Sequence, residues 1–102
     1  MSNTYGEDVN DFDLDLGNQH RLRWVTYADG MKRFGATIFH PDLKKPVEWC
    51  ASGILWDVLP NDVSPVWQLQ GQADEHITVS PSLLCLLCGD HGFIRDGKWV
   101  SA

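Results

Sequence analysis

The sequence lacks long apolar runs, and it has little positive charge. No apolar stretch approaches the roughly 20 residues that a membrane-spanning helix needs, and the first residues are polar. We therefore expect no transmembrane helix, no signal peptide and no membrane partner. Eight lysines and arginines stand against fourteen aspartates and glutamates, which gives a formal net charge of −6. Because nucleic-acid binding depends on basic side chains at phosphates, we do not expect it here.

Cysteine is also scarce. The chain has three cysteines, an odd number that suits a disulfide framework poorly and a reducing compartment well. The sequence thus predicts a cytoplasmic protein. Its 102 residues suit one domain with a modest core.

The acidic residues are unevenly distributed. Residues 1–17 contain five of the fourteen acids and no lysine or arginine, so the remaining nine acids nearly balance all eight bases. We expect residues 1–10 to form an acidic, disordered tail and residues 11–102 to form a single zinc-binding β domain. The tail would keep the domain soluble or meet a basic protein partner.

The zinc prediction rests on the run Cys85-Leu86-Leu87-Cys88-Gly89-Asp90-His91. Two thiols two residues apart, followed at once by glycine, form the tight turn that lets both sulfurs point at one ion. His91 follows three residues later and is the nearest third ligand. Cys50, which precedes an Ala-Ser-Gly turn, is the natural fourth. The predicted set is Cys50, Cys85, Cys88 and His91 around Zn²⁺, a closed structural site.

Several alternatives remain open at this stage. Cys50 could be a small core residue, and His91 could cap a turn. A redox role for the cysteine pair is disfavoured because no strand–helix pattern surrounds it. His76 is the main rival ligand, and with it Glu75 could serve as general base beside a metal-bound water. His20 and His40 are interpreted as surface histidines next to turns.

No helical period holds for three turns, and short β-rich runs fill the rest of the chain. Asp-Gly pairs at 29–30 and 96–97 predict hairpin turns. The predicted fold class is mostly β: a small antiparallel meander or sandwich with hairpins and a zinc knuckle, and little or no helix beyond one turn at residues 82–88. The expected strands cover 11–16, 21–27, 33–40, 46–50, 54–59, 66–69 and 76–79, with a hairpin at 93–100 and a loop at 60–65.

The second half of the chain resembles a family of small uncharacterised proteins of actinobacterial phages and bacteria. The matching residues are Trp67, the run Ile77 to Cys85 with its Ser80-Pro81-Ser82, and the run Cys88 to Trp99. Some of the broader relatives appear beside bacterial ubiquitin-like conjugation genes, where a metal-dependent peptidase role is suspected. The resemblance implies a zinc-binding phage accessory protein, with no activity attached.

The function predicted from the sequence is therefore a small zinc-stabilised phage accessory protein that binds a host or phage protein, in the host cytoplasm, without catalysis. The alternative is a metal-dependent, peptidase-like hydrolase with Glu75 as general base. A weaker third hypothesis is an acidic inhibitor that imitates nucleic-acid charge.

Overall fold

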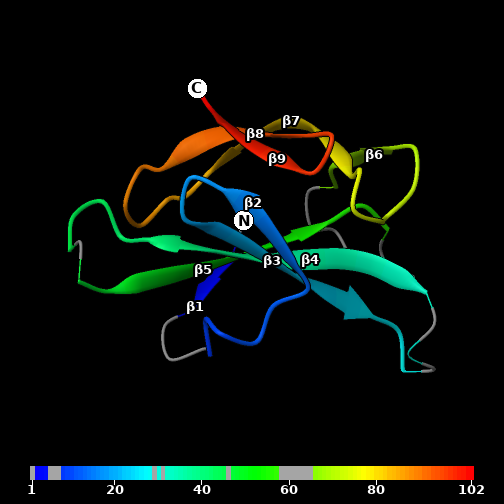
Figure 1. The fold of residues 1–102 in the computed structure, drawn as a ribbon, viewed down its shortest axis with the longest axis horizontal. Helices are drawn as coiled ribbons and strands as arrows, with labels where there is room; N and C mark the ends of the chain where they lie inside the picture. Colours follow the sequence, from blue (N-terminus) through cyan, green and yellow to red (C-terminus); the bar gives the residue numbers. More distant parts are fainter. Residues whose placement is uncertain (1, 5–7, 29, 31, 46, 58–65) are drawn as a thin grey trace.

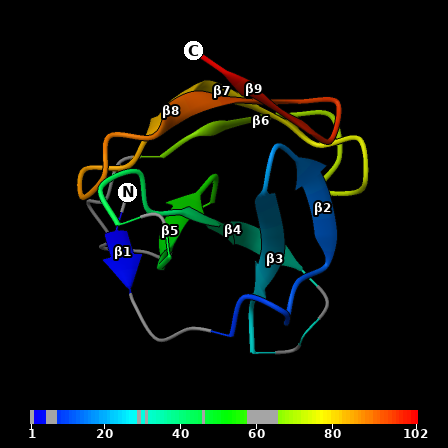
Figure 2. The ribbon, with the colours of Figure 1, turned by 60° about the vertical axis from the view of Figure 1, so that its left-hand side comes forward.

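The protein folds as two antiparallel β-sheets that pack face to face (Figures 1 and 2). The computed structural model describes residues 2–4, 8–28, 30, 32–45, 47–57 and 66–102. It contains no helix in these ranges, so the prediction of a mostly-β sandwich is confirmed. In the same ranges there is accordingly no helix of the length and apolar character needed to cross a membrane.

The larger sheet has five strands in the order β1-β5-β4-β3-β2, each antiparallel to its neighbour. It is a meander of consecutive hairpins from β2 to β5, with β1 added at the far edge (Figure 2). The strands are β1 (Ser2–Thr4), β2 (Leu14–Gly17), β3 (His20–Thr26), β4 (Arg33–Pro41) and β5 (Trp49–Leu55).

The smaller sheet is a four-stranded meander in the order β6-β7-β8-β9, and it arches over the larger one (Figure 2). Its strands are β6 (Gln68–Gln70), β7 (Thr78–Leu84), β8 (His91–Arg95) and β9 (Lys98–Ser101). The pairing of β7 with β8 is irregular between Val79 and Leu83, where β7 carries extra residues opposite Phe93.

The core lies between the two sheets. Alternate residues of the central strands point inwards, as the period of two in a β-strand requires, and their aliphatic side chains interdigitate there. Burying each large aliphatic side chain contributes about 1.5–3 kcal/mol before the loss of conformational entropy is counted. The buried cluster consists of Leu16, Leu22, Ala36, Ile38, Ile54, Ile77, Val79, Leu83, Ile94 and Trp99.

The structure matches the sequence expectations most closely at the β8–β9 turn. Asp96 and Gly97 both have positive φ, at 49° and 72°, which is the conformation an Asp-Gly hairpin turn adopts. The other predicted turn includes Asp29, and the predicted loop at 60–65 and the start of the strand at 46–50 also fall on residues outside the described ranges.

Three segments differ from expectation. The Ala-Ser-Gly turn predicted after Cys50 is absent, because β5 runs without a break from Trp49 to Leu55 and pairs with β4 throughout. Within the tail that the sequence predicts to be disordered, Ser2–Thr4 pairs with β5. Backbone hydrogen bonds hold an edge strand of this kind. The sequence Ser-Asn-Thr contains no apolar residue, so apolar–polar alternation could not have predicted the strand. The single helical turn predicted at 82–88 is absent, because β7 continues to Leu84 and residues 86–88 form a hydrogen-bonded turn.

Candidate metal centre and serine–histidine pair

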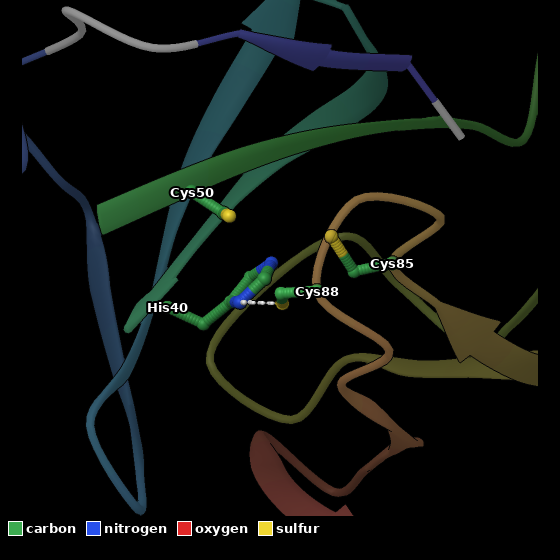
Figure 3. A group of neighbouring side chains, drawn as sticks. All are labelled: His40, Cys50, Cys85 and Cys88. Carbon is green, nitrogen blue, oxygen red and sulfur yellow. Dashed lines mark hydrogen bonds between the residues drawn. The ribbon is translucent and has the colours of Figure 1, made fainter. Parts of the chain in front are cut away.

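Four buried side chains converge where the two sheets meet at one end of the sandwich (Figure 3). His40 on β4 and Cys50 on β5 come from the larger sheet, where they are direct partners across the ladder. Cys85 and Cys88 come from the turn that joins β7 to β8. The three sulfurs and one imidazole nitrogen all lie within 4.8 Å of one another.

The turn from Cys85 to Gly89, called the knuckle below, is closed by two backbone hydrogen bonds. The amide of Gly89 donates to the carbonyl of Cys85 at 2.8 Å, and the amide of Cys85 donates to the carbonyl of Asp90 at 2.8 Å. Gly89 has a φ of +83°, a left-handed conformation that glycine adopts without strain. The glycine after the second cysteine therefore permits the bend that brings both thiols to the same point.

Hydrogen bonds inside the knuckle favour the thiolate form of Cys85. Burial opposes ionisation of this thiol, but hydrogen bonds with the backbone of Cys88 and Leu87 and with the side chains of Cys88 and Ser52 outweigh it. The pKa of Cys85 is lowered as a result. Because the thiolate is the form that binds metals, the knuckle prepares Cys85 as a ligand.

The fourth member, His40, is held as a neutral imidazole. Burial lowers the pKa of His40, and the nearby carboxylate of Asp90 only partly offsets this effect. The Nε2 atom lies 3.1 Å from the hydroxyl oxygen of Ser52. The Nδ1 atom lies 3.3 Å from the carbonyl oxygen of Pro41 and 3.9 Å from the sulfur of Cys88 (Figure 3). A buried, neutral imidazole whose nitrogens lie among thiols and second polar partners suits metal binding.

The group can therefore hold a metal ion. Three thiols and one imidazole form the donor set of closed, structural zinc sites, and four protein ligands complete a tetrahedron. Because the four potential ligands come from β4, β5 and the knuckle, a bound ion would link the larger sheet to the knuckle of the smaller one.

Three of the four predicted ligands are brought together by the fold, and His40 stands where His91 was expected. His91 is not a member of the group among the described residues. His40 was interpreted as a surface histidine, but only 2% of it is exposed. His40 is 45 residues before Cys85, so it forms no short metal-ligand motif with the cysteines of the knuckle. The feature that could have identified His40 as a ligand is the register of the predicted strands at 33–40 and 46–50, because their antiparallel pairing places His40 opposite Cys50.

A second histidine of the larger sheet, His20, contacts the same carboxylate as His40. Asp90 lies 2.5 Å from Nε2 of His20 and 3.5 Å from Nδ1 of His40, and the His20 ring stacks on Trp99 with 4.0 Å between centroids. Burial opposes ionisation of Asp90, but interactions that include hydrogen bonds with the His20 ring and the backbone of His91 outweigh it, so the pKa of Asp90 lies below its ordinary value. Asp90 thus connects the knuckle to both histidines.

His91 forms a different contact. Its Nε2 atom lies 2.8 Å from the Oγ atom of Ser82, at an exposed position on the outer face of the smaller sheet. The two residues come from adjacent strands, Ser82 from the irregular part of β7 and His91 from the first position of β8. A histidine nitrogen within hydrogen-bond reach of a serine hydroxyl is the arrangement that activates a serine nucleophile.

The backbone of this pair is anchored on both sides. The indole nitrogen of Trp67 donates to the carbonyl oxygen of Ser82 at 3.3 Å. The amide of Ala102 donates to the carbonyl oxygen of His91 at 3.0 Å. Among the described residues no carboxylate contacts Nδ1 of His91, so the arrangement is a dyad rather than a serine–histidine–aspartate triad.

The structure records one other serine–histidine hydrogen bond among the described residues, between Ser52 and His40. Ser52 is fully buried and His40 belongs to the metal-ligand group, so no substrate could reach that pair. Exposure therefore singles out Ser82 and His91. Sequence reasoning noted the Ser80-Pro81-Ser82 motif but assigned it no chemistry.

The predicted alternative site at Glu75 and His76 is not assembled in the described part of the chain. Nδ1 of His76 lies 2.9 Å from the carboxylate of Asp96, and the side chains of His76 and Glu75 are both 71% exposed. Neither belongs to a group of potential metal ligands among the described residues. Glu75 is therefore not placed beside a group of potential metal ligands in this part of the chain.

Comparison with known protein families identifies one that matches this chain. A family model described as "Bacterial ubiquitination-like system serine protease (BubE)" matches residues 39–102, well over half of the chain. This range contains the four candidate metal ligands and both members of the serine–histidine pair. No curated protein and no solved structure matches the chain.

Proposed function

The chain belongs to the BubE family of bacterial ubiquitination-like system serine proteases, and on this premise we propose that it is a serine hydrolase that cleaves acyl bonds of a protein in such a system. The observation that carries the proposal is the 2.8 Å contact between Ser82 Oγ and His91 Nε2 on an exposed face. The family description calls for a serine nucleophile, and this is the accessible serine that a histidine contacts among the described residues.

The chemistry assigned to each residue follows from the geometry. His91 Nε2 accepts the proton of the Ser82 hydroxyl as the Oγ atom bonds to the carbonyl carbon of the substrate. The same proton then passes from His91 to the leaving amine or alcohol as its bond to that carbon breaks. In the second step His91 takes a proton from a water molecule as the water oxygen bonds to the acyl carbon. The ester bond to Ser82 then breaks, the proton returns from His91 to Ser82 Oγ, and the carboxylic acid leaves.

We further propose that the metal is zinc and that its role is structural. His40, Cys50, Cys85 and Cys88 would hold it, and it would supply a tetrahedral cross-link between the sheets. Ser82 lies three residues before Cys85, and His91 lies three residues after Cys88. The knuckle therefore closes the connection between the two members of the dyad, and fixing it fixes their separation. Reduced thiols in this site fit a cytoplasmic location.

A phosphonofluoridate probe that labels activated serines tests the proposal. We expect wild-type protein to gain the mass of the probe at Ser82, and Ser82→Ala to gain none. Because general-base assistance contributes about 10²-fold or more, His91→Ala should be labelled at least about a hundredfold more slowly. Ser101→Ala is the matched control, since Ser101 is an exposed serine on β9 of the same sheet and no histidine contact is recorded for it among the described residues.

Labelling at Ser80, or equal labelling rates in wild type and His91→Ala, would overturn the assignment. A folded, metal-loaded protein that no serine probe labels would instead favour the non-catalytic role predicted from the sequence, in which the protein acts by binding a host or phage protein.

A further inference from the structure

A groove on the outer face of the smaller sheet begins at the proposed nucleophile. It encloses about 520 Å³, and its lining residues come from β6, β7 and β8. Ser82 stands at one end, close to His91, and the groove extends along β8 past Phe93 to the β8–β9 turn. The residues that line it include Ser80, Ser82, Phe93, Arg95 and Asp96. The groove therefore also contains one carboxylate, that of Asp96, which His76 contacts at 2.9 Å.

Arg95 is oriented over this groove by an aromatic ring. Its guanidinium carbon lies 4.3 Å from the centroid of the Phe93 ring, a cation–π contact that restricts the side chain while leaving its N–H groups available. The residue is exposed. No carboxylate of the described residues forms an ion pair with Arg95, so within that part of the chain its positive charge has no ion-pair partner.

Each of the other three arginines has a hydrogen-bond or ion-pair partner, whereas none is recorded for Arg95 among the described residues. Arg21 donates to the carbonyl of Val9, Arg23 pairs with Asp11, and Arg33 donates to the carbonyl of Ala73. The acid nearest in sequence to Arg95 is Asp96, whose carboxylate is engaged by His76. All four arginines lie over aromatic rings, but Arg95 is the one for which no hydrogen-bond or ion-pair partner is recorded among the described residues. In a chain with a net charge of −6, its guanidinium is therefore the exposed positive charge most available to a ligand in this groove.

From these observations we propose that the groove is the substrate-binding cleft and that Arg95, held on Phe93, selects an acidic residue of an extended peptide. The proposal rests on the hydrolase function proposed above and names its substrate class. His91 and Arg95 are four residues apart on one strand, or about 13 Å at roughly 3.3 Å per residue. An extended peptide with its scissile bond at Ser82 therefore places a side chain about four residues away near Arg95.

Phe93 has a second role in this cleft. Its ring lies between the dyad and Arg95 on the same face of β8, with its centroid 6.3 Å from that of His91. It provides an apolar surface for the peptide between the scissile bond and the acidic residue. Phe93 and Arg95 are thus residues that determine specificity, whereas Ser82 and His91 carry out the chemistry.

Peptide binding to the Ser82→Ala variant tests the proposal without any need for turnover. The probes are two fluorescein-labelled peptides of about ten residues, with glutamate or glutamine at the fourth position on either side of the central bond. We expect fluorescence anisotropy to show about fivefold tighter binding of the glutamate peptide at low salt, the scale of one exposed ion pair, and a smaller preference at high salt.

Arg95→Gln in the same background should abolish this preference. Lys98→Gln is the matched control, because Lys98 pairs with Arg95 across the hairpin and carries the same charge but does not line the groove. Phe93→Ala should weaken binding of both peptides and reduce the preference, since it removes the surface that orients Arg95.

Equal binding of the two peptides, or a preference that survives Arg95→Gln, would overturn the inference. A preference lost equally in Lys98→Gln and Arg95→Gln would show general charge attraction and would also overturn it. The serine probe gives an independent result for the proposed function. If the probe labels Ser82 but the protein shows no preference for the glutamate peptide, the hydrolase proposal stands and the cleft assignment is wrong. If the preference is found but Ser82 is not labelled, the hydrolase proposal is wrong.

Discussion

The carboxylate of Asp90 lies 2.5 Å from the imidazole Nε2 atom of His20, which is 70 positions away in the chain. His20 begins β3 in the larger sheet, and Asp90 directly precedes β8 in the smaller one. The contact therefore joins the two sheets beside the metal-ligand group, and Asp90 stands between that group and His91.

Replacing Asp90 by asparagine should destabilise the fold. The change preserves the shape of the side chain but removes the charge that strengthens its hydrogen bond to His20, and the carboxylate is only 13% exposed. We expect a loss of about 1–3 kcal/mol in the free energy of unfolding, measured by urea denaturation. Asp11→Asn is the control, because its ion pair with Arg23 is exposed and should contribute about 0–1 kcal/mol. Equal effects of the two changes would contradict this account.

The metal-ligand group should bind a single zinc ion per chain, and His40 rather than His91 should be its imidazole ligand. Elemental analysis should find zinc in His91→Ala and His76→Ala, and little or none in His40→Ala and Cys50→Ser. The reason is that only His40 and Cys50 of these residues have ligand atoms within the cluster of donor atoms. Retention of zinc in His40→Ala with loss in His91→Ala would restore the ligand set predicted from the sequence.

Removing the metal should lower both stability and serine reactivity. Structural zinc sites can contribute on the order of 10 kcal/mol to folding, so a strong chelator should lower the melting temperature markedly. Because the knuckle joins the strands that carry Ser82 and His91, serine labelling should fall in parallel and return when zinc is restored. Full labelling after complete removal of the metal would show that the dyad does not depend on the knuckle.

Gly92 should not tolerate a side chain. A Cβ atom at this position would lie 2.5 Å from Cζ2 of Trp99 and 2.6 Å from the carbonyl oxygen of Val100. Both contacts are too close, so β8 must shift beside His91, and overpacking of this kind costs about 1–3 kcal/mol. Urea denaturation of Gly92→Ala should show this loss. Ser101→Ala, at the exposed partner position on β9, should leave stability nearly unchanged.

The titration of His76 should report its contact with Asp96. The hydrogen bond and charge of Asp96 raise the pKa of His76 above its ordinary value of 6.5. The contact therefore stabilises the folded state most fully below pH 6.5, and this contribution disappears as the pH rises through the raised pKa of the folded state. Proton NMR of the histidine ring should show the raised pKa, and Asp96→Asn should bring it down. An unchanged titration in Asp96→Asn would contradict the contact.

The secondary structure followed from local features of the sequence. Alternation of apolar and polar residues, the absence of a helical period and the Asp-Gly pair at 96–97 are all short-range properties, so the mostly-β class and the β8–β9 hairpin could be predicted. The knuckle was equally local, since Cys85, Cys88 and Gly89 lie within one turn. Three cysteines in a chain of this length left little choice of thiol ligands.

The tertiary structure determined which histidine joins the metal-ligand group, which forms a hydrogen bond with Asp90 and which contacts Ser82. His20, His40, His76 and His91 are all near turns in the sequence, and nothing local separates them. Strand register brings His40 to Cys50, while packing of the two sheets brings both to the knuckle and His20 to Asp90. The irregular pairing in β7 brings Ser82 to His91. Short-range pattern determines which element a residue joins, but a site made from several strands depends on contacts between residues distant in sequence, which the register of the strands and the packing of the sheets establish.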